Sequence, residues 1–115
     1  MSLSQAQGKL GETLASQFLE KQGFSIVAKN FRWRRNEIDL IVKKERLLVF
    51  VEVKLRKNQA FGRPEDFMSP EQQERVLQAA EQYVLENDWP HDIRFDIIAI
   101  TQQTGELLHL PDAFY

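Results

Sequence analysis

Five charged side chains stand at alternating positions in two neighbouring, otherwise apolar stretches of the sequence. They are Glu37, Asp39, Glu52, Lys54 and Arg56. Carboxylates placed close together repel one another, and burial makes their ionised forms costlier. Salt bridges to Lys54 and Arg56 would offset that cost. A divalent cation would also do so, because magnesium prefers one or two carboxylates together with water and phosphate oxygens.

A cation held by these carboxylates would point to phosphate chemistry. It could lower the pKa of a bound water and clamp a phosphate. Lys54 could orient or deprotonate the attacking water, or neutralise charge that develops on the phosphate. Asp and Glu are disfavoured in strands as apolar as these, which favours a functional role for Asp39, Glu52 and Lys54 over a surface ion-pair cluster.

A β-hairpin is the element that would bring these residues together. We expect strands over Glu37–Lys43 and Leu47–Leu55, joined by a two-residue turn at Lys44-Glu45. This register makes Asp39 and Glu52 diagonal neighbours, within about 5–8 Å. Because side chains alternate along a strand, the apolar positions should share one buried face and the charged ones the other. These apolar positions are Ile38, Leu40 and Val42 on the first strand, and Leu47, Val49, Val51, Val53 and Leu55 on the second.

The remaining elements follow from apolar periodicity, capping residues and turn residues. The order α-β-β-β-α-β-β predicts an α/β class with a mixed sheet flanked by helices, built as a single domain over residues 1–115. The expected helices are Ser4–Gln22 and Pro70–Asn87, the latter capped by Ser69; the expected strands are an irregular one over residues 24–28 and 31–33, then Ile93–Thr101 and Leu107–Leu110.

Glu12 lies at the edge of the apolar arc of the first helix. Gly8 and Gly11 each cost a helix about 1 kcal/mol relative to alanine. Their presence indicates a close approach to the sheet, which would carry Glu12 toward the acidic residues. The alternative is an ordinary boundary glutamate.

Cations cluster in the segment Lys29–Arg35, which also holds two aromatics. Arginines bind phosphates in forked geometry and aromatics stack on unpaired bases, so a nucleic-acid contact competes with a solvated strand whose aromatics reach the core. Asp96 is interpreted as a structural hydrogen-bond acceptor, and His91 and His109 as incidental. The expected nucleic-acid contacts are Arg32, Arg34, Arg35, Arg56, Lys57 and Gln73, with Gln73 alternatively a satisfied boundary amide.

Composition excludes several classes of protein. The net charge of −2 argues against a nucleic-acid coat protein but not against a nuclease with an acidic site. The chain has no cysteine, no signal-peptide pattern and no apolar run of roughly 20 residues. These features predict a cytoplasmic protein without disulfides or membrane spans.

Nearly the whole chain resembles the YraN-like family of small bacterial proteins. The matching stretches include Gly8-x-x-Gly11-Glu12-x-x-Ala15, Asn36-Glu-Ile-Asp39-Leu-Ile and Val51-Glu-Val-Lys54-x-Arg56, followed by Gly62, Ala79-Ala80-x-x-Tyr83 and Arg94-Phe-Asp96. Asn36 replaces the usual glycine, a change expected to alter only a turn. The second helix lacks the lysine expected near Gln72-Gln73.

The hairpin also resembles the D…ExK core of the PD-(D/E)xK superfamily, which includes restriction endonucleases and Holliday-junction resolvases. That resemblance implies a restriction-endonuclease-like αβββαβ core and Mg²⁺ or Mn²⁺ held by Asp39, Glu52 and the Val53 carbonyl. Glu12 would match a helix glutamate of resolvase-like members. The implied activity is endonucleolytic cleavage of DNA, branched DNA being favoured, by a chain that could pair as a homodimer. The alternative is a non-catalytic nucleic-acid-binding or scaffold module with the same fold.

Overall fold

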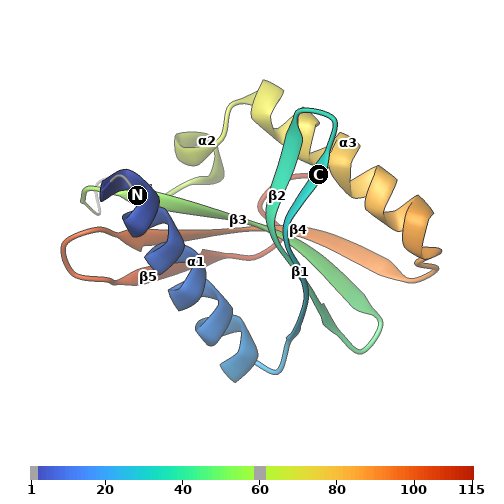
Figure 1. The fold of residues 1–115 in the computed structure, drawn as a ribbon, viewed down its shortest axis with the longest axis horizontal. Coiled ribbons are helices and arrows are strands. Elements are labelled where there is room, and N and C mark those ends of the chain that lie inside the picture. Colours follow the sequence, from blue (N-terminus) through green and yellow to red (C-terminus); the bar gives the residue numbers. More distant parts are fainter. Residues whose placement is uncertain (1–2, 59–61) are drawn as a thin grey trace.

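Five strands form one mixed sheet, in the order β1-β2-β3-β4-β5, in the computed structural model, which describes residues 3–58 and 62–115 (Figure 1). The strands are β1 (Ser25–Trp33), β2 (Asn36–Lys44), β3 (Leu47–Arg56), β4 (Asp92–Thr101) and β5 (Leu107–Leu110). β3 and β4 run parallel, and the other neighbouring pairs are antiparallel. The predicted α/β class with a mixed sheet is confirmed.

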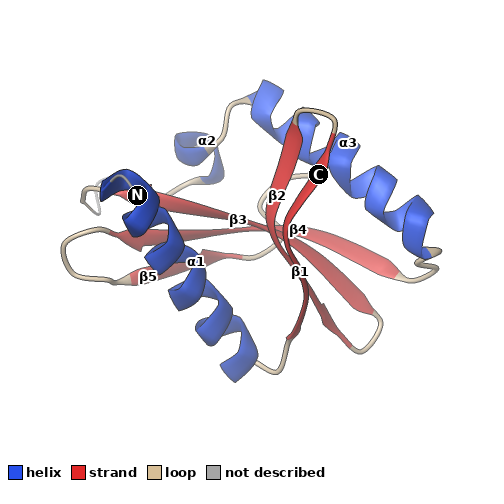
Figure 2. Ribbon diagram, in the orientation of Figure 1, coloured by secondary structure: helices blue, strands red, loops and turns tan. Residues whose placement is uncertain are grey.

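Two long helices cover opposite faces of this sheet (Figure 2). The helices are α1 (Leu3–Lys21), α2 (Pro64–Phe67) and α3 (Pro70–Asn87). α1 buries Ala15 and Leu19 against one face, and α3 buries Val76, Ala79 and Ala80 against the other. Within the part of the chain that the structure describes, no helix is both long and apolar enough to cross a bilayer.

Each long helix bears out one local expectation from the sequence. Ser69 caps α3, since its hydroxyl accepts the Gln72 N–H at 3.2 Å while the Gln72 side chain accepts the Ser69 N–H at 2.9 Å. A Cβ on Gly11 would lie 3.1 Å from the Leu55 side chain, so α1 does approach the sheet closely there. Gly8 faces open space, so the same expectation was wrong for that residue.

The β2–β3 hairpin turns one residue later than predicted. Glu45 and Arg46 form the turn, Glu45 with φ of 55°, and Lys44 pairs with Leu47. Ile41 consequently pairs with Phe50 and Leu40 with Val51. The predicted register was wrong by one residue on each strand. Because the two shifts add up to two residues, the same residues of β2 and β3 still point to the same face of the sheet. Asp39 now lies directly opposite Glu52 instead of diagonal to it.

One apolar residue of β2 packs on the face opposite to the one predicted. Leu40 and Val42 share one face as expected, and this face is the α1 side, but Ile38 belongs to the core on the α3 side, with Ile41. The strict alternation therefore breaks at Asp39. In β1, Asn30 adopts a positive φ of 52° at the matching position, which re-aims the side chains that follow it.

Beyond this break, β2 separates from β3. Their pairing ends at Leu40–Val51, whereas β1 and β2 stay paired to Trp33–Asn36 and β3 stays paired with β4 to Arg56. The β1–β2 tip bends toward α3, as Figure 1 shows. Asn36 is not a turn residue but a buried member of β2, whose amide donates to Gln78 of α3 at 3.3 Å. The expectation that Asn36 alters only a turn was wrong.

Candidate functional site

Asp39 and Glu52 face each other where β2 and β3 separate. The Val53 N–H donates to Asp39 Oδ2 at 2.8 Å, and the Asp39 N–H approaches Glu52 Oε1 at 3.4 Å. Side-chain oxygens thus replace the carbonyl acceptors that a continued ladder would supply. Glu52 is only 7% exposed, so the pair lies at the inner end of the gap between the strands.

The pKa values of both carboxyl groups lie above the ordinary values for Asp and Glu. Burial, followed by repulsion from Asp39, raises the pKa of Glu52 to about 8 against the attraction of Lys54. Burial also raises the pKa of Asp39 to about 6, with Glu12 and Glu37 adding repulsion while the Val53 N–H and Lys54 oppose it. Near neutral pH the pair therefore carries less than its full negative charge, a state that a divalent cation would reverse.

Lys54 stands beside Glu52 at the wall of a polar cleft between β2, β3 and the start of α3. Its Nζ lies 4.0 Å from Glu52 Oε2, and its side chain is 28% exposed. The cleft encloses about 490 Å³, its open mouth included. Its other lining residues are Arg35, Asn36, Glu37, Met68, Gln72, Arg75 and Val76. Two carboxylates, Glu37 and Glu52, thus meet cations in a space open to solvent.

The Val53 carbonyl points into the same gap. The N–H and C=O of a strand residue face the same neighbouring strand, and the Val53 N–H bonds to Asp39. Two carboxylates and this carbonyl are hard oxygen donors of the kind that Mg²⁺ takes alongside water and phosphate. Among residues 3–58 and 62–115, no three Asp, Glu, His or Cys side chains form a metal-holding group. A cation bound there would complete its coordination with water or substrate.

Glu12 reaches the rim of this gap from α1. With its amide nitrogen turned toward the carboxylates, Asn30 donates to Glu12 Oε1 at 3.1 Å and to Glu37 Oε1 at 3.0 Å. Glu37 also pairs with Arg32 at 3.1 Å. The three hairpin carboxylates do not share one face as the register predicted. Glu52 contacts the backbone N–H of Asp39, while Glu37 meets Glu12 of α1 through Asn30.

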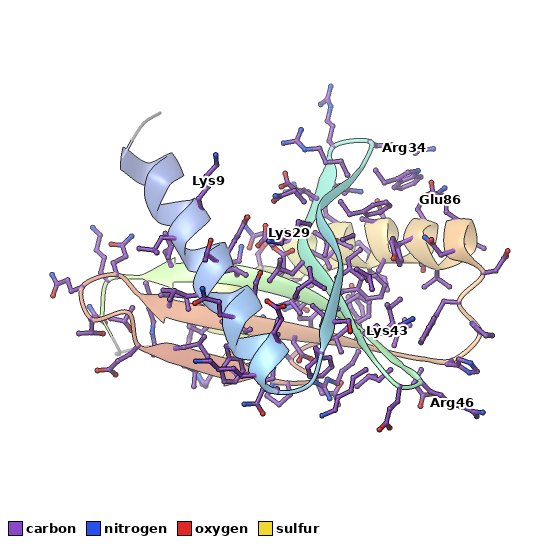
Figure 3. All side chains as sticks on the ribbon, turned by 60° about the horizontal axis from the view of Figure 1, so that its bottom comes forward. Lys9, Lys29, Arg34, Lys43, Arg46 and Glu86 are labelled. Carbon is purple, nitrogen blue, oxygen red and sulfur yellow. The ribbon has the colours of Figure 1, made fainter. Side chains whose placement is uncertain are left out.

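The predicted cationic rim divides into separate places. Arg35 lines the cleft, and Arg34 lies at the β1–β2 tip with its guanidinium 4.3 Å from the centre of the Trp33 ring. Arg56 points to the other side of β3, where its Nε donates to Thr101 at 3.1 Å, and the exposed Lys57 follows β3. Arg34 lies far from Lys43 and Arg46, which mark the opposite end of the hairpin (Figure 3).

Helix α3 contributes a cation that the sequence analysis missed. Arg75 lines the cleft one turn after the position where a lysine was expected. The sequence feature that could have identified Arg75 is its position next to Val76, at the edge of the apolar face of the helix. The Gln73 amide donates to the Met68 carbonyl at 3.4 Å, as a boundary amide would, and Gln72 lines the cleft in its place.

A second buried carboxylate, Asp96, is structural. It accepts bonds from Arg94 at 2.8 and 2.9 Å and from the Asp112 N–H at 3.0 Å, and His109 Nε2 lies 2.7 Å away. Burial acts to raise the pKa of Asp96, but these partners together outweigh it and hold the pKa below its ordinary value. Asp96 makes structural hydrogen bonds as its sequence context predicted, and His109, interpreted as incidental, is one of its partners.

Comparison with known proteins places the chain in a bacterial family. Residues 11–100 match the family described as "Uncharacterised protein family UPF0102". A UPF0102 protein of Flavobacterium psychrophilum is 44% identical over 110 residues, covering 94% of this chain and 92% of that protein. One from Dictyoglomus turgidum is 42% identical over 112 residues, covering 93% and 95%. The chain belongs to the UPF0102 family, which is the YraN-like group that its sequence resembles.

Proposed function

We propose that this protein is a Mg²⁺- or Mn²⁺-dependent phosphodiesterase that cleaves DNA, with a site of the restriction-endonuclease-like kind. The observation that carries the proposal is the Asp39–Glu52 pair. Two carboxyls with raised pKa values face each other beside Lys54, and Glu52 and Lys54 line a polar cleft. Such repulsion costs stability, so its retention favours a function that uses the charge.

The residues of the chain take separate roles in this reaction. Asp39, Glu52 and the Val53 carbonyl would hold the cation, which when bound lowers the pKa of a water and offsets phosphate charge. Lys54 Nζ, on the cleft side of Glu52, would orient the attacking water or donate to the phosphate as negative charge builds on it. Glu12, reached through Asn30, would hold a further water near Asp39.

The cleft gives the DNA backbone a path to these residues. Arg35 lies on the β1–β2 side and Arg75 on the α3 side, with Lys54 near the carboxylates. Paired arginines suit phosphate oxygens, which they bind in forked geometry. The resemblance to resolvases supports branched DNA as the substrate and a homodimer that cuts two strands.

Cleavage assays on plasmid and four-way-junction DNA test this function. Wild-type protein should cut when Mg²⁺ or Mn²⁺ is titrated in. Lys54→Ala should lose about 10²–10⁴-fold in rate, the usual contribution of a positioned proton-transfer group. Lys43→Ala, an exposed lysine near the far turn, is the matched control and should cut normally. Wild-type protein that binds cation and DNA but never cuts would support the non-catalytic binding module instead.

A further inference from the structure

Asn30 holds a backbone conformation that strands rarely use. Its φ is 52°, in the left-handed region that Asn and Asp tolerate better than other non-glycine residues. Lys29 pairs with Leu40 and Phe31 with Ile38, which sets Asn30 opposite Asp39. The unusual residue of β1 therefore lies beside the residue of β2 at which the sheet changes face.

The Asn30 side chain joins two carboxylates that come from different elements. Glu12 belongs to α1 and Glu37 to β2, and both lie within hydrogen-bond distance of one end of the amide, at 3.1 and 3.0 Å, which is assigned as nitrogen because it faces only acceptors. In the other orientation the nitrogen would reach only Glu12 Oε2, at 3.5 Å. That orientation would also set the amide oxygen against two carboxylate oxygens. One NH₂ group carries two hydrogens and can donate one to each carboxylate. The amide thereby offsets a repulsion that would push Glu12 and Glu37 apart.

From this geometry we infer that Asn30 is a positioning residue, which holds Glu12 and Glu37 together beside Asp39. The inference rests on the proposed function. Asn30 lies opposite Asp39 in the β1–β2 register, and Glu37 stands two residues before Asp39 on β2, so the bridge lies beside Asp39. Asn30 is itself exposed, so packing does not explain its side chain. Glycine would serve a positive φ equally well, and what asparagine adds is the amide.

Asn30→Gly separates the amide from the backbone conformation. Glycine relieves the positive φ while the hydrogen bonds are lost, so the melting temperature should stay within about 4 °C of wild type. Partners behind metal ligands typically contribute 10–100-fold to metal affinity. For an exposed amide we expect the low end, about tenfold weaker Mn²⁺ binding by calorimetry. Glu45→Gly, at φ 55° in the far turn, is the matched control and should bind Mn²⁺ normally.

Exchanging the Asn30 amide with the Glu12 carboxylate, in the absence of metal, tests the hydrogen bonds between these two side chains. Asn30→Asp should lower the melting temperature in EDTA, because it sets three carboxylates together. Adding Glu12→Gln should recover most of that loss, since amide and carboxylate then exchange sides. Mn²⁺ affinity of Asn30→Gly equal to wild type, or no recovery in the double variant, would overturn the inference. If wild-type protein binds no Mn²⁺, the proposed function is wrong, and the exchange alone decides whether Asn30 holds the two carboxylates.

Discussion

Glu52→Gln should make the metal-free protein more stable at neutral pH. Burial and Asp39 raise the pKa of Glu52 from 4.5 to about 8. A raised carboxyl pKa means that the folded state binds more protons than the unfolded chain. The raised pKa therefore lowers the free energy of unfolding: this loss is absent below about pH 4.5, grows as pH rises and is complete above about pH 8. At pH 7 it reaches about 3 kcal/mol, since each pKa unit is worth about 1.4 kcal/mol.

Glutamine removes the charge but keeps an oxygen for the Asp39 N–H. The attraction of Lys54, 4.0 Å away, is already included in the Glu52 pKa, but an amide NH₂ group is a poorer neighbour for the Lys54 ammonium than a carboxyl oxygen, which reduces the benefit. We therefore expect a gain of about 1–3 kcal/mol at pH 7, which for a chain of this size raises the melting temperature by about 4–12 °C. Asp39→Asn should give a gain of similar size at pH 7, because the rise of the Asp39 pKa from 3.8 to about 6 is fully expressed at that pH.

Thermal unfolding in EDTA at pH 4.5 and pH 7 measures this difference. The gain from Glu52→Gln should be large at pH 7 and nearly gone at pH 4.5. Asp96→Asn is the matched control, because Asp96 is also a buried carboxylate but has favourable partners, Arg94 and His109. That change should cost about 3–5 kcal/mol, as for breaking a buried ion pair. A lower melting temperature for both Glu52→Gln and Asp39→Asn at pH 7 would refute the reasoning and make the pair ordinary salt-bridge partners.

Three further predictions concern ligands. Neutralising either carboxylate of the Asp39–Glu52 pair should abolish Mn²⁺ binding in calorimetry, and equal binding by both variants would exclude the site. Alanine at Arg34 and Arg35 should weaken binding to branched DNA and reduce its salt dependence by about one unit of slope per lost phosphate contact. The comparison is alanine at Lys43 and Arg46, and equal losses from the two sets would mean diffuse binding. Arg75→Ala should lose about one unit of slope with unchanged Mn²⁺ affinity, and an unaltered slope would remove α3 from the DNA path.

Local patterns were enough to predict the two long helices, the five strands and the β2–β3 hairpin, but not the register of that hairpin. Ser69-Pro70 marked the start of α3, and alternation marked β2 and β3. The turn position failed because Lys44, Glu45 and Arg46 offer no glycine or asparagine to fix it. The error was harmless for the site because shifting both strands by one residue leaves Asp39 and Glu52 as neighbours across the hairpin.

Features that depend on contacts between distant segments could not be predicted from local sequence patterns. The face change at Ile38 coincides with the positive φ of Asn30, which lies opposite Asp39 on another strand. The role of Arg75 depends on how the β1–β2 tip bends over α3, and the contact between His109 and Asp96 depends on the pairing of β4 with β5. The four-residue α2 is too short to show a periodic pattern.

The separation of β2 from β3 also bears on self-association. It leaves two inward-facing strand edges, residues 36–39 of β2 and the β2 side of β3 beyond Val51. Unpaired edges are templates for strands of other chains, and inward-pointing charges are a common protection against this. Asp39, Glu52 and Lys54 occupy these edges, so the charges proposed for catalysis also keep other strands from adding there. A variant with all three neutralised should be more stable as a monomer and yet aggregate sooner as its concentration rises.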